Sequence, residues 1–287
     1  MSSQSLSKTL EMASRARACL SEDAAVACSR FFKNRRRRDG SFRGRSGDSD
    51  LYYTLFGVDG LLVLGEEPER EKLLSYLKGF GEGQDLDLVH LACLARCWTR
   101  LDEDSDGQSP LPHLLESLER MRRHAEPSIY SSFLVFISHE DAGVSLADPA
   151  DFLRSWLLPS SWKSGMQGNI TQMVQETTTL MAAVLVMESA LMGEVSKERS
   201  DWLLRRQCPS GGFLPHPGAP MPDLLSTAVA VYALRRTGMD HKINRRSCLG
   251  FVEAHWNEDG GFQASLIDSA TDVEYTFYGL LALGALL

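Results

Sequence analysis

The pattern that decides the fold is clearest in the stretch Asp259-Gly-Gly-Phe-Gln-Ala-Ser-Leu-Ile-Asp-Ser-Ala-Thr-Asp-Val-Glu-Tyr-Thr276. It begins with a Gly-Gly-Phe turn, continues through a short loop, and ends at an Asp four residues before a Thr, where an apolar helix starts. The same arrangement occurs in Asp39–Thr54 and in Ser210–Thr227, each time with a leucine seven residues after the threonine. Such internal repetition predicts a repeat architecture.

Weaker copies of the pattern fill the rest of the chain. Asp87–Leu91 keeps the aspartate, Gln175–Thr179 keeps the threonine, and the copy near Ser128–Ser132 is barely recognisable. We call the threonine of the pattern, or the residue at its position in a weaker copy, the anchor of the repeat. Successive anchors are about 37 to 49 residues apart, the length of a two-helix repeat. Six such repeats make residues 20–287 a single domain and leave residues 1–19 as an N-terminal extension.

The repeats alternate between two kinds of predicted helix. Segments at about 67–79, 111–124, 195–207 and 242–255 mix charged and apolar residues at helical spacing, which is typical of half-exposed helices. The segments that follow the anchors, such as Thr227–Leu234, are apolar on all sides, which indicates buried helices. We therefore predict an all-α fold, an α/α toroid (α6-α6 barrel) of six helical hairpins around an apolar central cavity.

Composition restricts the class of protein. The net charge of −8 argues against a general nucleic-acid binder, whose surface would be basic. No stretch approaches the roughly 20 apolar residues of a membrane span, and the N-terminus lacks the apolar core of a signal peptide. The six cysteines form no dense framework, which fits a reducing compartment, so we expect a cytoplasmic protein.

Several segments resemble the β subunits of protein prenyltransferases and the related squalene and terpenoid cyclases. Gly40–Gly65 is similar to a late repeat of a geranylgeranyltransferase β subunit, and Gln207–Phe213 and Asn244–Gly284 are similar to its middle repeats. The resemblance implies an α/α toroid whose central funnel holds an isoprenoid or another hydrophobic small molecule. It leaves open whether the chain is a monomer, a homo-oligomer or the partner of an α-subunit-like protein.

The zinc ligands of the protein prenyltransferases are not kept. The resemblance implies ligands as an Asp four residues and a Cys two residues before one anchor, and as a His one residue before another. Asp223 matches the first, but Leu225 replaces the cysteine and Tyr53 replaces the histidine. Because zinc needs thiolate, imidazole or carboxylate donors, we expect no zinc and no other cofactor.

One further pattern could hold a metal. His90, Cys93 and Cys97 lie on one face of a predicted helix, with Asp87 one turn earlier. A buried stripe of the core is the simpler interpretation, because free cysteines are commonly buried. We favour the core stripe and predict no metal site.

The related cyclases carry Asp-x-Asp-Asp-Thr at the start of a helix, and the second acid protonates the terpene. The stretch Asp272-Val-Glu-Tyr-Thr276 resembles this motif, with Glu274 at the position of the second acid and Tyr275 in place of the last. A buried carboxyl group can act as a general acid because desolvation raises its pKa. Glu274 and Asp272 are therefore the candidate catalytic residues. The alternative for Glu274 is an ion pair with a nearby arginine.

Helix capping is the simpler interpretation for the periodic aspartates, Asp272 included. Each lies just before an inner helix, where a carboxylate can accept hydrogen bonds from free backbone N–H groups. The set consists of Asp50, Asp87, Asp223 and Asp272.

Arg43 and Arg45 are the candidate diphosphate-binding residues, because guanidinium groups match phosphate oxygens. The resemblance implies a diphosphate-binding arginine at the position of Arg45. The preceding run Arg35–Arg38 is interpreted as a solvent-facing helix end. Aromatic residues near the anchors are predicted to line the cavity: Tyr52, Tyr53, Phe56, Tyr130, Tyr275 and Tyr278.

Two functions follow from these observations. The first is a prenyltransferase-like or terpenoid-cyclase-like protein that binds an isoprenoid, as a prenyl diphosphate, in the central cavity without the usual zinc site. The alternative is a non-catalytic toroid that acts as a lipid-binding or protein-interaction module. The first is the leading interpretation. The lost zinc ligands and the degenerate third repeat motivate the alternative, so the sequence leaves open whether the protein is an enzyme.

Overall fold

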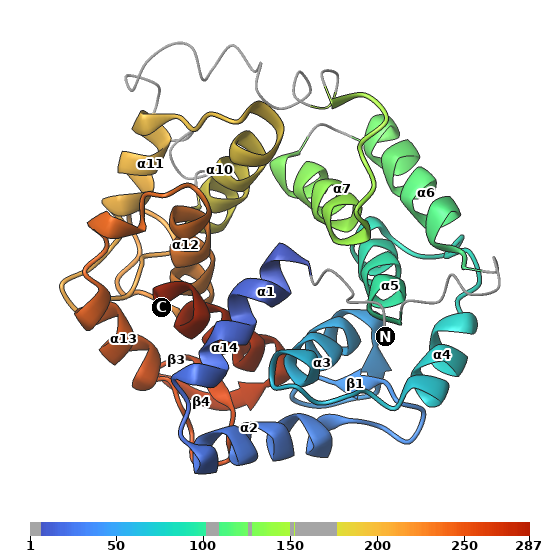
Figure 1. Ribbon diagram of the computed structural model, residues 1–287, viewed down its shortest axis with the longest axis horizontal. Helices are drawn as coiled ribbons and strands as arrows, with labels where there is room; N and C mark the ends of the chain where they lie inside the picture. Colours follow the sequence, from blue (N-terminus) through green and yellow to red (C-terminus); the bar gives the residue numbers. More distant parts are fainter. Residues whose placement is uncertain (1–6, 102–108, 126–127, 150–151, 153–176) are drawn as a thin grey trace.

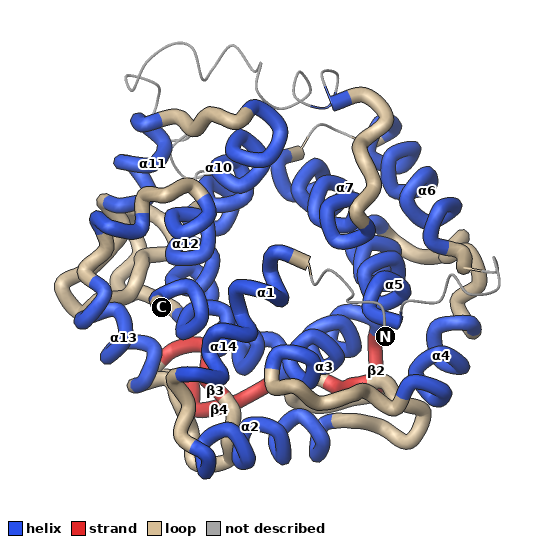
Figure 2. The backbone as a smooth tube through the Cα atoms, in the orientation of Figure 1, coloured by secondary structure: helices blue, strands red, loops and turns tan. Residues whose placement is uncertain are grey.

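The computed structural model describes residues 7–101, 109–125, 128–149, 152 and 177–287, in which two concentric rings of helices are seen (Figures 1 and 2). The inner ring contains α3 (Leu51–Val63), α5 (Leu88–Leu101), α7 (Ile129–Ala142), α10 (Thr178–Met192), α12 (Leu224–Arg236) and α14 (Val273–Leu286). The outer ring contains α2 (Glu22–Arg35), α4 (Arg70–Lys78), α6 (Leu111–His124), α11 (Lys197–Leu204) and α13 (Arg245–Glu253). The predicted all-α toroid is confirmed. Gln175, at the start of the fourth repeat pattern, lies outside the described residues.

Each inner helix begins at a polar cap. In α12, for example, Asp223 Oδ1 accepts a hydrogen bond from the backbone N–H of Ser226 at 2.6 Å. A side-chain oxygen at this position satisfies one of the backbone donors that a helix start leaves free. The caps of the inner ring are Asp50, Asp87, Ser128, Thr177, Asp223 and Asp272. The predicted capping role of the four aspartates is confirmed.

The anchor threonine joins each inner helix to the turn before it. Thr227 Oγ1 donates a hydrogen bond to the carbonyl oxygen of Asp223 at 2.7 Å and accepts one from the N–H of Phe213 at 2.9 Å. Thr54 and Thr276 make the same two bonds in their own repeats. All three side chains are fully buried. The hydroxyl therefore fixes the Gly-Phe turn against the first turn of the helix.

The glycine turns pack the outer helices against one another. A Cβ on Gly211, whose φ is +100°, would lie 2.0 Å from the carbonyl oxygen of Ser247 in α13. A Cβ on Gly260, whose φ is +90°, would lie 2.3 Å from the carbonyl oxygen of Ala27 in α2. Only glycine fits both the backbone conformation and the close approach. Because Gly260 belongs to the last repeat and α2 to the first, the second contact closes the ring.

Two short hairpins stand where the sequence indicated only turns and a loop. β1 (Phe42–Arg43) pairs antiparallel with β2 (Ser49–Asp50), and β3 (Phe262–Ser265) pairs antiparallel with β4 (Asp268–Asp272). Strands this short show no readable alternation of apolar and polar residues. In each hairpin the turn phenylalanine lies opposite the capping aspartate, so the hairpin positions the loop between them.

The N-terminal helix α1 (Lys8–Ser14) is followed by η1 (Arg15–Ala18), and it packs against α14 and α3 inside the ring (Figure 1). Lys8 pairs with Glu140 near the C-terminal end of α7. The hydroxyls of Thr9 and Tyr232 share a hydrogen bond of 3.0 Å. The carboxylate of Glu140 also accepts hydrogen bonds from both Nη groups of Arg236, near the C-terminal end of α12. The helix thus docks at the end of the ring where the inner helices terminate.

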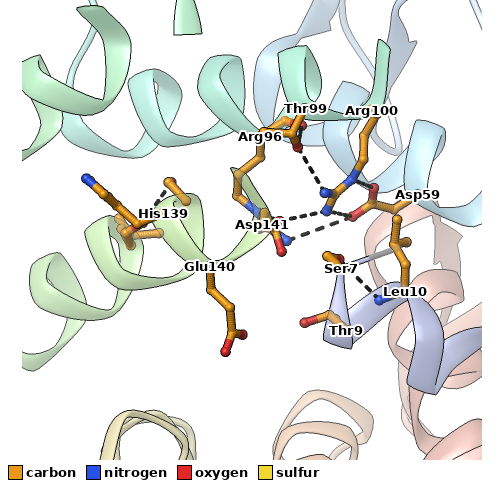
Figure 3. A network of polar contacts seen from close by, with 12 residues as sticks. Ser7, Thr9, Leu10, Asp59, Arg96, Thr99, Arg100, His139, Glu140 and Asp141 are labelled. Atoms are coloured by element: carbon orange, nitrogen blue, oxygen red, sulfur yellow. Dashed lines mark hydrogen bonds and ion pairs between the residues drawn. The ribbon is translucent and has the colours of Figure 1, made fainter. Parts of the chain in front are cut away.

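A buried ion network joins three neighbouring inner helices (Figure 3). Arg100 of α5 donates to Asp59 of α3 and to Asp141 of α7, at 2.7 Å in each case. Arg96 of α5 also donates to Asp141, at 2.7 Å. Burial by itself raises the pKa of Asp141, but the two guanidinium groups hold it below its ordinary value. Replacement of one of these residues by a neutral one would leave an uncompensated buried charge, which would destabilise the folded protein.

We expect Thr227→Val to lower the free energy of unfolding by about 2–3 kcal/mol, because it leaves the buried N–H of Phe213 without an acceptor. Thr237→Val is the matched control. The hydroxyl of Thr237 bonds only to helix carbonyls, so its loss should cost less than about 1 kcal/mol. Urea unfolding of both variants measures the difference. Equal losses would contradict the bridging role of the anchor threonine.

Candidate functional site

A tyrosine–glutamate pair lies where the first and last repeats meet. The hydroxyl of Tyr52 donates a hydrogen bond to Oε1 of Glu274 at 2.6 Å. Tyr52 is the second residue of α3 and Glu274 is the second residue of α14. Both side chains are half-buried. Ring closure makes these helices neighbours, so residues at the same place in two repeats face each other.

Burial raises the pKa of Glu274 to about 7, with the Tyr52 hydrogen bond and the charge of Arg45 opposing the rise and the charge of Asp272 adding to it. A carboxyl group with a pKa near neutrality is protonated often enough to serve as a general acid. Burial also raises the pKa of Tyr52, and the neighbouring groups Tyr278 and Glu274 raise it further by charge repulsion. Tyr52 therefore remains a neutral hydrogen-bond donor to the carboxyl group.

Arg45 is bound by two carboxylates beside this pair. Its Nη1 lies 2.6 Å from Oδ2 of Asp268, and its Nε lies 2.9 Å from Oδ2 of Asp272. The guanidinium carbon also lies 5.8 Å from the ring centroid of Tyr275. Hydrogen bonding to Asp268 is the largest influence that raises the pKa of Arg45. The partner of Glu274 is thus Tyr52, while the nearby arginine pairs with Asp272.

The two acids of the motif differ in what their oxygens contact. Asp272 uses Oδ1 to cap α14, accepting the N–H of Tyr275 at 2.9 Å, and uses Oδ2 to bind Arg45. Asp272 is 2% exposed and both of its oxygens are engaged. Among the described residues Glu274 forms no ion pair, and its one printed partner is a neutral phenol. The geometry therefore gives Asp272 a structural position and leaves Glu274 free to exchange a proton.

An aromatic wall lies next to Glu274. The ring centroids of Tyr52 and Phe56 are 5.0 Å apart, and those of Phe56 and Tyr278 are 5.4 Å apart. Phe277 joins the cluster at 5.7 Å from Phe56, a contact that the sequence did not indicate. Burial raises the pKa of Tyr278, and the charge of Glu274 adds to the rise. These rings form an aromatic cluster beside a carboxyl group, in which Phe56 and Phe277 are buried.

The other predicted lining residues lie around this wall. The ring of Tyr53 contacts that of Tyr52 at 5.5 Å and covers Gly44, while Tyr275 lies under Arg45. Tyr130, at the start of α7, is 47% exposed. Burial raises the pKa of Tyr130, with smaller contributions from Cys93 and Glu274. The structure therefore brings most of the predicted aromatic residues to the α3–α14 junction, with Tyr130 on a separate helix.

Arg43 does not join Arg45. It lines a surface concavity of about 580 Å³ together with Asn34, Arg36, Arg37, Arg38 and Asp39. The prediction that Arg35 faces the solvent, together with Arg36 to Arg38, is wrong for Arg35. It is half-buried, and its guanidinium donates to the carbonyl of Gly44 and to the hydroxyl of Thr271. The packing of neighbouring hairpins, which the sequence does not reveal, draws this side chain inward.

The positions that would supply zinc ligands do not fit a metal. Leu225 has no donor atom, Tyr53 packs its ring on Tyr52, and Oδ1 of Asp223 accepts the cap hydrogen bond. Within the described ranges no three His, Cys, Asp or Glu side chains converge as metal ligands would. Cys93 and Cys97 are buried in the core, as predicted for a core stripe. We therefore derive no chemistry through a metal ion.

The family model of the prenyltransferase alpha-alpha toroid domain matches residues 155–286. The matched segment covers less than half of the chain, and it is similar to that domain. The match confirms the resemblance to the prenyltransferase and terpenoid cyclase superfamily, and it includes Glu274 and Asp272. No curated protein matches the sequence significantly. In the part of the toroid that the structure describes, no helix has the length and apolar character needed to cross a membrane.

The role of Tyr52 is the main feature that the sequence analysis missed. It was predicted only as a lining residue, although it lies two residues after its capping aspartate, as Glu274 does. That shared offset is the signal that could have revealed the pair, because closure of the ring places the first and last repeats side by side. Asp268, the second partner of Arg45, carried no such signal.

The raised pKa of Glu274 predicts a pH-dependent stability. The folded protein holds this proton more tightly than the unfolded chain, so the free energy of unfolding should fall as the pH rises from about 4.5 to about 7. The fall should be on the order of 2 kcal/mol. Glu274→Gln removes the titrating group, so its stability relative to the wild type should increase across this window. Urea unfolding at a series of pH values measures it.

Glu258→Gln is the control for this measurement, because Glu258 is exposed on the surface. Its stability should follow the wild-type pH dependence. A Glu274→Gln variant that also follows the wild-type dependence would show that Glu274 titrates alike in the folded and unfolded chains.

Proposed function

We propose that the toroid binds an isoprenoid without zinc and that Glu274 is the general acid that protonates it, in terpenoid-cyclase-like chemistry. The observation that carries the proposal is the Tyr52–Glu274 pair, a half-buried carboxyl group with a pKa of about 7 beside a cluster of aromatic rings. A hydrophobic wall with one convergent polar group is the usual form of a site for an apolar ligand. Its place at the start of inner helices agrees with the family's motif position.

We call the residues around the Tyr52–Glu274 pair, with Arg45, Asp268 and Asp272, the rim. The charges of the rim favour binding of the hydrocarbon part of the ligand. Arg45 already pairs with Asp268 and Asp272, so it offers little positive charge to a diphosphate. The three carboxyl groups near it outnumber the one guanidinium. Protonation of a carbon–carbon double bond therefore fits the rim better than binding or transfer of a prenyl diphosphate.

The proposed step transfers the proton of Glu274 to a terminal double bond of the isoprenoid. A C–H bond forms from the π electrons, and the adjacent carbon becomes a cation. The faces of Tyr52, Phe56 and Tyr278 stabilise positive charge through their quadrupoles. The Tyr52 hydroxyl stabilises the carboxylate that remains, because hydrogen bonds to the charged form lower its energy. A second double bond of the same molecule then attacks this cation, so that a C–C bond closes a ring and the positive charge moves to a further carbon. That cation loses a proton to water and Glu274 takes a proton back from water, so the product is a cyclic isomer of the substrate.

The second candidate function is a non-catalytic lipid-binding or protein-interaction module. Leu225 and Tyr53 replace metal donors, and Tyr275 replaces the last acid of the cyclase motif. These substitutions are what we expect of a toroid that kept its fold but lost catalytic activity. This candidate predicts binding without turnover, so the same measurement separates the two functions.

We expect purified protein, incubated with squalene or with farnesyl or geranylgeranyl diphosphate, to yield an isomeric cyclic product detectable by gas chromatography and mass spectrometry. Glu274→Gln should lower turnover by about 100-fold or more while ligand binding persists. Tyr52→Phe should lower it by about tenfold, because one hydrogen bond to the carboxylate is lost. Tyr53→Phe is the control, since its hydroxyl does not contact Glu274.

Isothermal titration with the same compounds separates binding from turnover. Binding to the wild type without any product would support the non-catalytic module. Absence of binding to all of the isoprenoids would falsify the proposed function.

A further inference from the structure

An arginine-rich turn follows α2 at the outer edge of the toroid. Arg36 adopts an extended conformation and forms an isolated bridge with Phe42, and the N–H of Arg37 donates to the carbonyl of Ser41 at 2.8 Å. A Cβ on Gly40, whose φ is +83°, would lie 2.7 Å from the backbone nitrogen of Leu73 in α4. The chain therefore doubles back tightly and is fixed on α4. This brings the arginines that precede the turn beside the one that follows it.

The concavity at this turn is strongly positive. Four of its six lining residues are arginines and one is an aspartate, which gives a net charge of +3 (four minus one). The aspartate, Asp39, directs Oδ1 to the N–H and hydroxyl of Ser41. The carboxylate of Asp39 therefore stabilises the turn, and the arginines give the surface of the concavity its positive charge. Because the whole chain carries −8, this positive concavity is a local feature.

The arginines of the concavity are not saturated by carboxylates. Arg36 pairs with Glu69, and Arg37 lies 3.5 Å from Asp48, whose side chain is 97% exposed. An ion pair so exposed contributes little and is readily exchanged. Across the described residues, Arg38 and Arg43 form no ion pair. The positive charge of these two side chains is thus available to a ligand.

We propose that Arg36, Arg37, Arg38 and Arg43 form a binding site for phosphate groups, separate from the rim that contains Glu274. Planar guanidinium groups bind phosphate oxygens in bidentate pairs, and several at one place match a dianion or a diphosphate. A volume of about 580 Å³ accommodates such a group with the molecule attached to it. The site stands independently of the proposed function, since it shares no residue with the Tyr52–Glu274 pair.

The phosphate could belong to a soluble compound or to a phospholipid headgroup, and a neighbouring hairpin distinguishes the two sources. Leu266 and Ile267 form the tip of the β3–β4 hairpin and are 54% and 80% exposed. The adjacent Asp268 is tied to Arg45, two residues beyond Arg43. A lipid surface would contact this apolar tip as well as the arginines. A soluble phosphate compound would contact the arginines alone.

The first test is isothermal titration of the full chain with inorganic diphosphate at low salt. We expect the double variant Arg38→Ser, Arg43→Ser to lower the affinity at least about tenfold, as loss of two charge-assisted contacts should. The matched control is Arg17→Ser, Arg246→Ser, which removes the same charge from exposed positions elsewhere. It should bind diphosphate as the wild type does. Circular dichroism checks that both variants fold.

The second test is co-sedimentation with phosphatidylcholine vesicles, with and without phosphatidylserine, and adds the variant Leu266→Ser, Ile267→Ser. Vesicle binding that is lost in both the arginine variant and the hairpin variant supports the site with a lipid headgroup as its ligand. Diphosphate binding that only the arginine variant loses supports the site with a soluble ligand. The proposal is overturned if the wild type binds neither probe, or if the arginine variant binds as well as the wild type.

Discussion

The buried hydroxyl of the anchor threonine is the interaction on which the rest of the toroid depends. In three repeats it joins the carbonyl of the capping aspartate to the N–H of the turn phenylalanine. The bond fixes where each inner helix starts relative to the outer helix before it. The first, fifth and last repeats share this geometry, so the starts of α3, α12 and α14 are held in the same way. In the first and last repeats, the residues two positions after the cap, Tyr52 and Glu274, are in contact.

The candidate site is a consequence of this geometry. Ring closure places the first turn of α14 beside that of α3, and Glu274 meets Tyr52 there. Asp272 cannot take the same part, because the cap occupies one of its oxygens and Arg45 the other. Burial without a cationic contact then leaves Glu274 with a pKa near neutrality. Two acids that are two residues apart thus acquire different chemistry from their surroundings.

The basic residues near the first repeat divide in a similar way. Arg45 turns to the carboxylates of the last repeat, whereas Arg43 stays with the turn that follows α2. The positive charge of Arg45 is thereby paired with carboxylates, and the outer concavity keeps its positive charge. At the opposite end of the inner helices, Glu140 binds Lys8 of α1 as well as Arg236 of α12. The two ends of the ring are therefore chemically distinct.

The sequence by itself determined the toroid, the alternation of buried and half-exposed helices, and the capping aspartates, because these depend on local periodicity and on spacings that repeat along the chain. Only the tertiary structure decided the partner of Glu274, the pairing of Arg45 with Asp268, the inward position of Arg35 and the docking of α1. Tyr52 and Glu274 are 222 residues apart, and Arg45 and Asp268 are 223 apart. No local pattern encodes contacts of that range. They exist because Gly260 lets the last repeat approach α2 closely enough to close the ring.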